Sequence, residues 1–106
     1  MESYSTRCLF EWEPRDGQKK VHLYEERITL WQAESADDAI EMAEREAEAY
    51  AGEDSTYLDV CQSYWLVDPV AVSGVEVFSL LRESDLEPSA YINAFFETGD
   101  EHQRSD

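Results

Sequence analysis

The sequence predicts an α+β fold in which a four-stranded, mainly antiparallel sheet carries two helices in the order ββαββα. Three observations support this prediction. Apolar residues alternate along residues 4–12, and residues 20–32 are rich in β-formers, with a turn-forming Pro-Arg-Asp-Gly segment between the two runs. A helical spacing replaces the alternation between Ser35 and Gly52. Two more β-forming segments and a second apolar helix follow.

The first two segments are predicted to pair as an antiparallel hairpin. Side chains repeat every two residues along a strand, so a two-residue loop (16–17) and a four-residue loop (14–17) give the same two faces. The expected core face carries Cys8, Phe10, Trp12, Val21, Leu23, Glu25, Arg27 and Trp31. The opposite face carries Arg7, Leu9, Glu11, His22, Tyr24, Glu26, Ile28 and Leu30. With the two-residue loop, Arg7 reaches Glu26 as an exposed pair that contributes under about 1 kcal/mol.

Residues 36–51 are predicted to form a helix. Ser35 begins a capping box with an acid at its third position, and Gly52 suits the left-handed residue that ends a helix. The apolar stripe is mostly alanine, which permits close approach to a sheet, with Ile40 and Tyr50 as its bulky members.

The third and fourth strands are expected at residues 57–67 and 74–82, and a short helix is expected from Pro88 to Gly99. The third strand is apolar on both sides, so both of its faces need cover. One helix on each face of the sheet satisfies this need. Two helices on one face and a partner chain on the other also satisfy it, and that arrangement implies a homodimer.

The chain has 106 residues, and its length predicts one domain over residues 1–99 with a frayed acidic tail over residues 100–106. Its net charge is −17, and residues 34–106 hold nineteen acids against three bases. Such a charge argues against direct binding of nucleic-acid phosphates, which requires clustered lysine and arginine. Apolar stretches fall far short of the roughly 20 residues that span a bilayer, and no signal peptide is recognisable. We therefore expect a cytoplasmic protein that does not bind membranes.

Motifs for catalysis, cofactors and metals are absent from the sequence. Nucleophile elbows, phosphate-binding glycine loops, zinc-protease helices and calcium loops are all missing, and only His22 and His102 suit acid–base catalysis near neutral pH. Cys8 and Cys61 lack the spacing of a zinc or redox site and are interpreted as small buried hydrophobic residues. We expect no catalytic residue, no cofactor and no dedicated metal site.

Glu25 and Arg27 form the candidate polar site. They lie two positions apart on the predicted core face, near Leu23 and Trp31, so their charges must be paired with each other or with a neighbour. A catalytic interpretation makes the carboxylate a base and the guanidinium an anchor for an anion. The simpler interpretation is an ion pair at the end of the sheet or at a dimer contact.

Two further groups of residues are candidate binding surfaces. Glu41, Glu44 and Glu48 form an acidic face of the first helix, which either keeps the protein soluble or steers it toward a basic partner. Trp31 and Trp65 are candidate contacts in a pocket or a dimer, because tryptophan is favoured at interfaces.

Segments 4–11, 24–30, 39–50 and 76–82 together resemble those of small, single-domain bacterial proteins classed as domain of unknown function 4288. The similarity covers about residues 4–99. It implies a bacterial cytoplasmic protein and brings no activity, ligand or catalytic residue with it.

The sequence thus favours a non-enzymatic protein-binding module that acts as a homodimer, through its sheet face or its aromatic second helix. An alternative is an acidic inhibitor, such as an immunity protein or a mimic of nucleic-acid charge, that neutralises a basic partner. A second alternative is an enzyme for a small ligand that uses Glu25 and Arg27.

Overall fold

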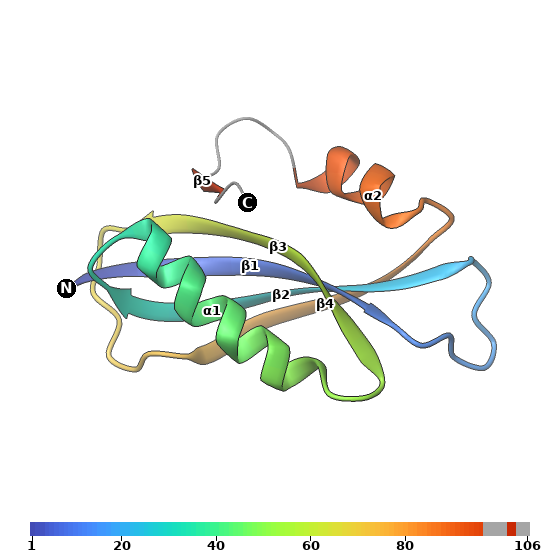
Figure 1. Ribbon diagram of the computed structural model, residues 1–106, viewed down its shortest axis with the longest axis horizontal. Helices are drawn as coiled ribbons and strands as arrows, with labels where there is room; N and C mark the ends of the chain where they lie inside the picture. Colours follow the sequence, from blue (N-terminus) through green and yellow to red (C-terminus); the bar gives the residue numbers. More distant parts are fainter. Residues whose placement is uncertain (97–101, 104–106) are drawn as a thin grey trace.

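The protein folds as an α+β structure in which the predicted order ββαββα is followed by a two-residue fifth strand (Figure 1). This computed structural model describes residues 1–96 and the backbone of residues 102–103. The elements are β1 (Glu2–Trp12), β2 (His22–Ala33), α1 (Ala36–Ala51), β3 (Ser55–Leu66), β4 (Val75–Ser84), α2 (Pro88–Phe95) and the short β5 (His102–Gln103). No helix within the described residues is long and apolar enough to cross a membrane.

The sheet has the strand order β4-β2-β1-β3-β5, and every neighbouring pair is antiparallel. The first hairpin forms its centre. β3 joins this hairpin beside β1, and β4 joins it beside β2, so β4 forms one edge of the sheet (Figure 1).

The hairpin register differs from both predicted loops. Regular pairing ends at Trp12 opposite Leu23, and a longer loop joins the two strands. The Gln18 side chain closes this loop, because it accepts a hydrogen bond from the backbone of Arg15 and donates to the carbonyl of Lys20. The register is shifted by two residues from that of the two-residue loop and by four from that of the four-residue loop, and because both shifts are even the predicted faces are unchanged. Val21 is the exception, since it lies in the loop and is exposed rather than in the core.

Helix α1 confirms its predicted bounds and its Ser35 cap, and Gly52 ends it in a positive-φ conformation other than the predicted left-handed helical one. The Ser35 hydroxyl accepts a hydrogen bond from the Asp38 backbone at 3.1 Å, and Gly52 takes a positive φ of 61° after the last turn. The buried stripe consists of Ala39, Ile40, Ala43, Ala47 and Ala51. It packs on the sheet face that carries Phe10 and Trp31, which we call the α1 face.

Helix α2 covers part of the opposite face, which we call the α2 face. Its Tyr91 and the adjoining Phe96 are buried against Leu9, Tyr24 and Val60. One helix therefore covers each face, and the alternative with both helices on one face is wrong. The helix ends at Phe95 rather than at the predicted Gly99, which lies outside the described residues.

Strand β3 contributes to both cores, as its two apolar faces predict. Tyr57 and Cys61 pack on the α1 face, whereas Leu58 and Val60 pack on the α2 face. A bulge with Asp59 at a positive φ of 60° interrupts the strand. Cover from both helices means that β3 requires no partner chain. Of the predicted frayed tail, residues 100, 101 and 104–106 lie outside the described part, and the backbone of residues 102–103 pairs with β3.

Candidate functional site

Glu25, Glu26 and Arg27 occupy consecutive positions of β2, so their side chains alternate between the two faces of the sheet. The exposed fractions of these residues are 3%, 6% and 7%. Burial of a charge is costly unless partners satisfy it. Their partners therefore define two buried ionic clusters, one beneath each helix.

On the α1 face, Glu25 accepts hydrogen bonds from three elements. The Trp12 indole nitrogen lies 2.9 Å from Oε1, and the Tyr50 hydroxyl lies 3.0 and 2.9 Å from the two carboxylate oxygens. The Ser79 hydroxyl from β4 donates to Oε2. Burial, followed by the hydrogen bond to Glu25, raises the pKa of Tyr50 to about 12. Both oxygens of Glu25 are thus occupied by groups of the protein.

Arg27 binds two carboxylates and an aromatic ring on the same face. Its guanidinium donates to Glu46 of α1, with 2.9 Å between Nη2 and Oε2, and to Glu76 of β4. The guanidinium also lies 3.8 Å from the centroid of the Tyr50 ring. Burial alone would lower the pKa of Arg27, but the hydrogen bonds to Glu46 and Glu76 raise it above its usual value. Tyr50 therefore connects Arg27 to Glu25.

On the α2 face, Glu26 accepts hydrogen bonds from two arginines and a tyrosine. Arg7 Nη2 lies 2.5 Å from Oε1, while Arg82 Nη1 and the Tyr91 hydroxyl lie 3.1 and 2.6 Å from Oε2. The predicted Arg7–Glu26 contact is present, but it forms diagonally, because Arg7 faces Ile28 in the ladder. It is also partly buried, so the prediction of an exposed pair is wrong.

The Glu26 cluster attaches α2 to the sheet. Arg7 donates to the carbonyl of Phe95 at 3.1 Å and lies 3.7 Å from the centroid of the Phe96 ring. Gln62 donates to the Phe96 carbonyl. Burial and the hydrogen bond to Glu26 raise the pKa of Tyr91, so its hydroxyl stays protonated as a donor. These contacts place the end of α2 over β1 and β3.

Glu25 and Arg27 are each satisfied by other groups of the protein: Arg27 forms ion pairs with Glu46 and Glu76, whereas Glu25 accepts hydrogen bonds from neutral side chains. A general base must reach a substrate proton, whereas both oxygens of Glu25 already accept protein hydrogen bonds. A cavity of about 580 Å³ beside the first hairpin loop is lined by Leu23, Leu81 and Arg82 rather than by this pair. Within the described residues, no group of three or more His, Cys, Asp or Glu side chains is arranged to hold a metal ion.

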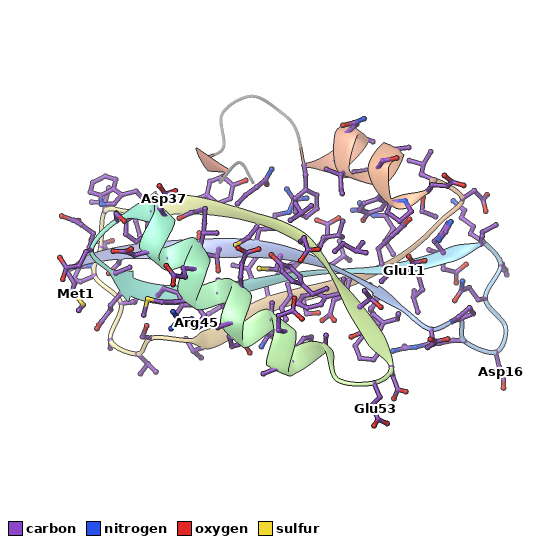
Figure 2. All side chains as sticks on the ribbon, viewed as in Figure 1. Met1, Glu11, Asp16, Asp37, Arg45 and Glu53 are labelled. Carbon is purple, nitrogen blue, oxygen red and sulfur yellow. The ribbon has the colours of Figure 1, made fainter. Side chains whose placement is uncertain are left out.

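The acidic surface of α1 is smaller than its sequence indicates. Glu41 is exposed and pairs with Arg45 at 2.7 Å, and Glu48 is exposed. Glu44 instead accepts a hydrogen bond from the Tyr57 hydroxyl at 2.6 Å and is half-buried. Figure 2 shows Asp37 and Arg45 on α1 and Glu53 in the turn that follows it.

The two candidate tryptophans have different environments. Trp31 is buried in the α1-face core, where its indole nitrogen donates to the hydroxyls of Thr6 and Thr29 at 2.9 and 2.7 Å. Trp65 is 59% exposed on β3 and donates to Glu2 at 2.9 Å. Cys8 and Cys61 are direct cross-strand neighbours, and both are buried thiols.

The edge strand β4 presents an apolar surface that the sequence predictions do not include. Val75, Val77, Phe78 and Leu81 are 39%, 52%, 50% and 41% exposed. The outer edge of β4 pairs with no other strand of residues 1–96 or 102–103. An exposed apolar edge of this kind is a template for pairing with another chain.

The partners of Glu25 and Arg27 were also missed from sequence. Tyr50 and Glu46 lie four residues apart, so helical periodicity places them on one side of α1, and this spacing is a usable signal. Ser79 and Glu76 come from β4, whose position beside β2 follows only from the strand order.

Comparisons with known proteins found nothing: no family model, no curated protein and no solved structure matches this chain. The resemblance to domain of unknown function 4288 stays a prediction.

Proposed function

We propose that this protein is a non-enzymatic protein-binding module whose binding surface is the edge strand β4. The observation that carries the proposal is the exposure of Val75, Val77, Phe78 and Leu81 along an edge that has no partner among the described strands. Strand addition supplies main-chain hydrogen bonds for affinity, and alternate side chains supply specificity. Groups of the protein occupy both oxygens of Glu25 and the guanidinium of Arg27, which gives no support to the enzyme hypothesis.

The test compares two variants that each place a lysine at an exposed valine. Val77→Lys puts a charge on the edge, whereas Val67→Lys puts it at a 78% exposed position just beyond β3. Tagged proteins are used to capture chains from host cells that also make the untagged protein. We expect wild type and Val67→Lys to retain an identified chain, either another protein or the untagged copy, that Val77→Lys loses. The purified tagged protein and the purified captured chain must reproduce this difference. Equal capture by wild type, Val67→Lys and Val77→Lys contradicts the proposal.

Acidic inhibition of a basic partner is the second candidate function, because the net charge is −17 and Glu41 and Glu48 are exposed. Repeating the capture at low and high ionic strength separates the two candidates. Charge-driven binding is lost at high salt and is unaffected by Val77→Lys. Edge binding persists at high salt and is lost in Val77→Lys.

A further inference from the structure

Strand β4 has one feature that protects edge strands, a bulge at Val77 in its pairing with β2, and lacks most of the others. Edges are ordinarily short, interrupted by proline, charged or covered. β4 has ten residues without proline, and Glu76 is the only charged residue between Val75 and Leu81. Its far end is held by the hairpin loop, because Glu83 accepts hydrogen bonds from the backbones of Lys19 and Lys20 at 2.9 and 3.1 Å. The open part of the edge is therefore residues 75–82.

We propose that the strand bound at this edge is β4 of a second copy, paired antiparallel about a two-fold axis through Ser79. This inference rests on the proposed function and names the partner of the same site. A two-fold axis perpendicular to the sheet keeps each face continuous across the interface. Paired residues of an antiparallel ladder share a face, so only registers centred on a residue, rather than between two residues, are compatible with the pleat.

The register centred on Ser79 matches apolar side chains with apolar side chains. It places Phe78 opposite Leu80 of the second copy. Val77, at the bulge in the pairing with β2, comes level with Leu81 of the second copy at the end of the regular ladder. Phe78 and Leu80 face Ile28 and Glu26 in the β2 ladder, so both lie on the α2 face and extend one apolar surface across the axis. This match between apolar side chains across the axis follows from the sequence of β4.

The neighbouring registers are poorer. An axis at Phe78 sets this ring against its own symmetry mate, but it brings Leu80 level with Glu76 of the second copy, which lies beyond the bulge on the other face, so Leu80 has no apolar partner. An axis at Leu80 places Phe78 opposite Arg82 and Val77 opposite Glu83 of the second copy. Each shift replaces an apolar match by a mismatch on the half-buried surface.

Charge along the strand is compatible with this register. Six residue steps separate Glu76 from its symmetry mate, about 20 Å, and eight steps separate Glu83 from its own, about 26 Å. Both distances exceed the screening length of about 8 Å at physiological salt. Arg82 lies level with Glu76 of the second copy but on the opposite face, because Glu76 faces α1 beyond a bulge at Val77 whereas Arg82 faces α2. The edge therefore avoids the acid–acid contacts that a protein of charge −17 otherwise risks.

Sedimentation equilibrium over a concentration series tests self-association. Wild type and Val67→Lys are expected to form a dimer, and Val77→Lys is expected to raise the dissociation constant at least about 10-fold, because each symmetric contact then places a charge on the edge. Val77 is 52% exposed, so the variant retains its core. A wild type that stays monomeric at every concentration, or a Val77→Lys dimer of unchanged affinity, overturns the inference.

Cysteine cross-linking tests the register. In Ser79→Cys the two new thiols face each other with about 5 Å between α-carbons, whereas in Val75→Cys they are about 26 Å apart. Mild oxidation should give a covalent dimer of the first variant only. Cys8 and Cys61 are buried and are common to both. Cross-linking of Val75→Cys, or its absence in Ser79→Cys, overturns the register.

The outcomes separate this inference from the proposed function. A monomeric wild type that binds another protein, and loses it in Val77→Lys, overturns self-pairing and leaves the binding function in place. A chain with no edge-dependent partner, neither a second copy nor another protein, overturns both.

Discussion

Tyr50 is the residue on which the α1-face cluster depends. Its hydroxyl donates to Glu25 and its ring lies beneath the Arg27 guanidinium. One side chain from α1 thus satisfies an anion and a cation of β2 at once. This double contact fixes the distance between the helix end and the sheet.

Replacement of Glu25 by glutamine tests how strongly this cluster is coupled to folding. Glu25→Gln turns one acceptor oxygen into an NH₂ group that faces the Tyr50 and Ser79 hydroxyls. We expect the free energy of unfolding in urea to fall by about 1–3 kcal/mol, the usual cost of a disrupted buried hydrogen bond to a charged group. Glu48→Gln at an exposed position is the matched control and should change it by less than about 0.5 kcal/mol. Equal effects of the two substitutions would contradict a buried role for Glu25.

Tyr50 also predicts how stability depends on alkaline pH. Its pKa rises from 10.0 to about 12 through burial and the hydrogen bond to Glu25. The folded state therefore holds this proton more tightly than the unfolded chain. The resulting stability is fully present below pH 10 and is lost as the pH rises toward 12. Urea unfolding at a series of pH values from about 9 to about 11 should show this decline.

Tyr50→Phe provides the control for this pH dependence. It keeps the ring beneath Arg27 and removes the titrating hydroxyl. The decline should be shallower in the variant, although Tyr24, whose pKa burial also raises to about 12, still contributes. If the free energy of unfolding declined equally with pH in wild type and Tyr50→Phe, Tyr50 would be ruled out as a source of the pH dependence.

At the scale of elements, features that depend on local sequence were predictable, whereas features that depend on contacts between distant segments were not. Ser35 and Gly52 determine both ends of α1 through local capping, so its bounds were predictable. The faces of the hairpin were predictable because a register shift of two residues leaves them unchanged. The position of β4 beside β2 was not predictable, because it depends on how distant segments meet. The exposed edge and two partners of the ionic cluster follow from that position.

The alanine stripe of α1 makes a prediction at the same scale. Ala43 is fully buried against the sheet, so Ala43→Leu forces the helix outward and should lower the free energy of unfolding by about 1–3 kcal/mol. Ala49→Leu, on the exposed side of the same helix, is the control. Its free energy of unfolding should stay within about 0.5 kcal/mol of the wild-type value. Chemical denaturation measures both. Equal stability of the two variants would show that α1 is not closely packed.

At the scale of the whole molecule, the net charge of −17 opposes the compact state. Added salt screens this repulsion, so the melting temperature should rise as the screening length falls from about 30 Å at 0.01 M to about 10 Å at 0.1 M. The double variant Glu48→Gln and Glu53→Gln removes two exposed charges and should show a weaker rise. A melting temperature that falls with salt would contradict this prediction.

The alternation of Glu25, Glu26 and Arg27 across the sheet has a consequence for how the chain avoids misfolding. A one-residue slip of β2 that carried Glu26 to the position of Arg27 would turn its carboxylate toward Glu46 and Glu76. The opposite slip would carry Arg27 to the position of Glu26, beside Arg7 and Arg82. In either direction, like charges would meet beneath one of the two helices. We infer that these three residues fix the register of β2, because their charges destabilise the slipped sheet more than they stabilise the correct one.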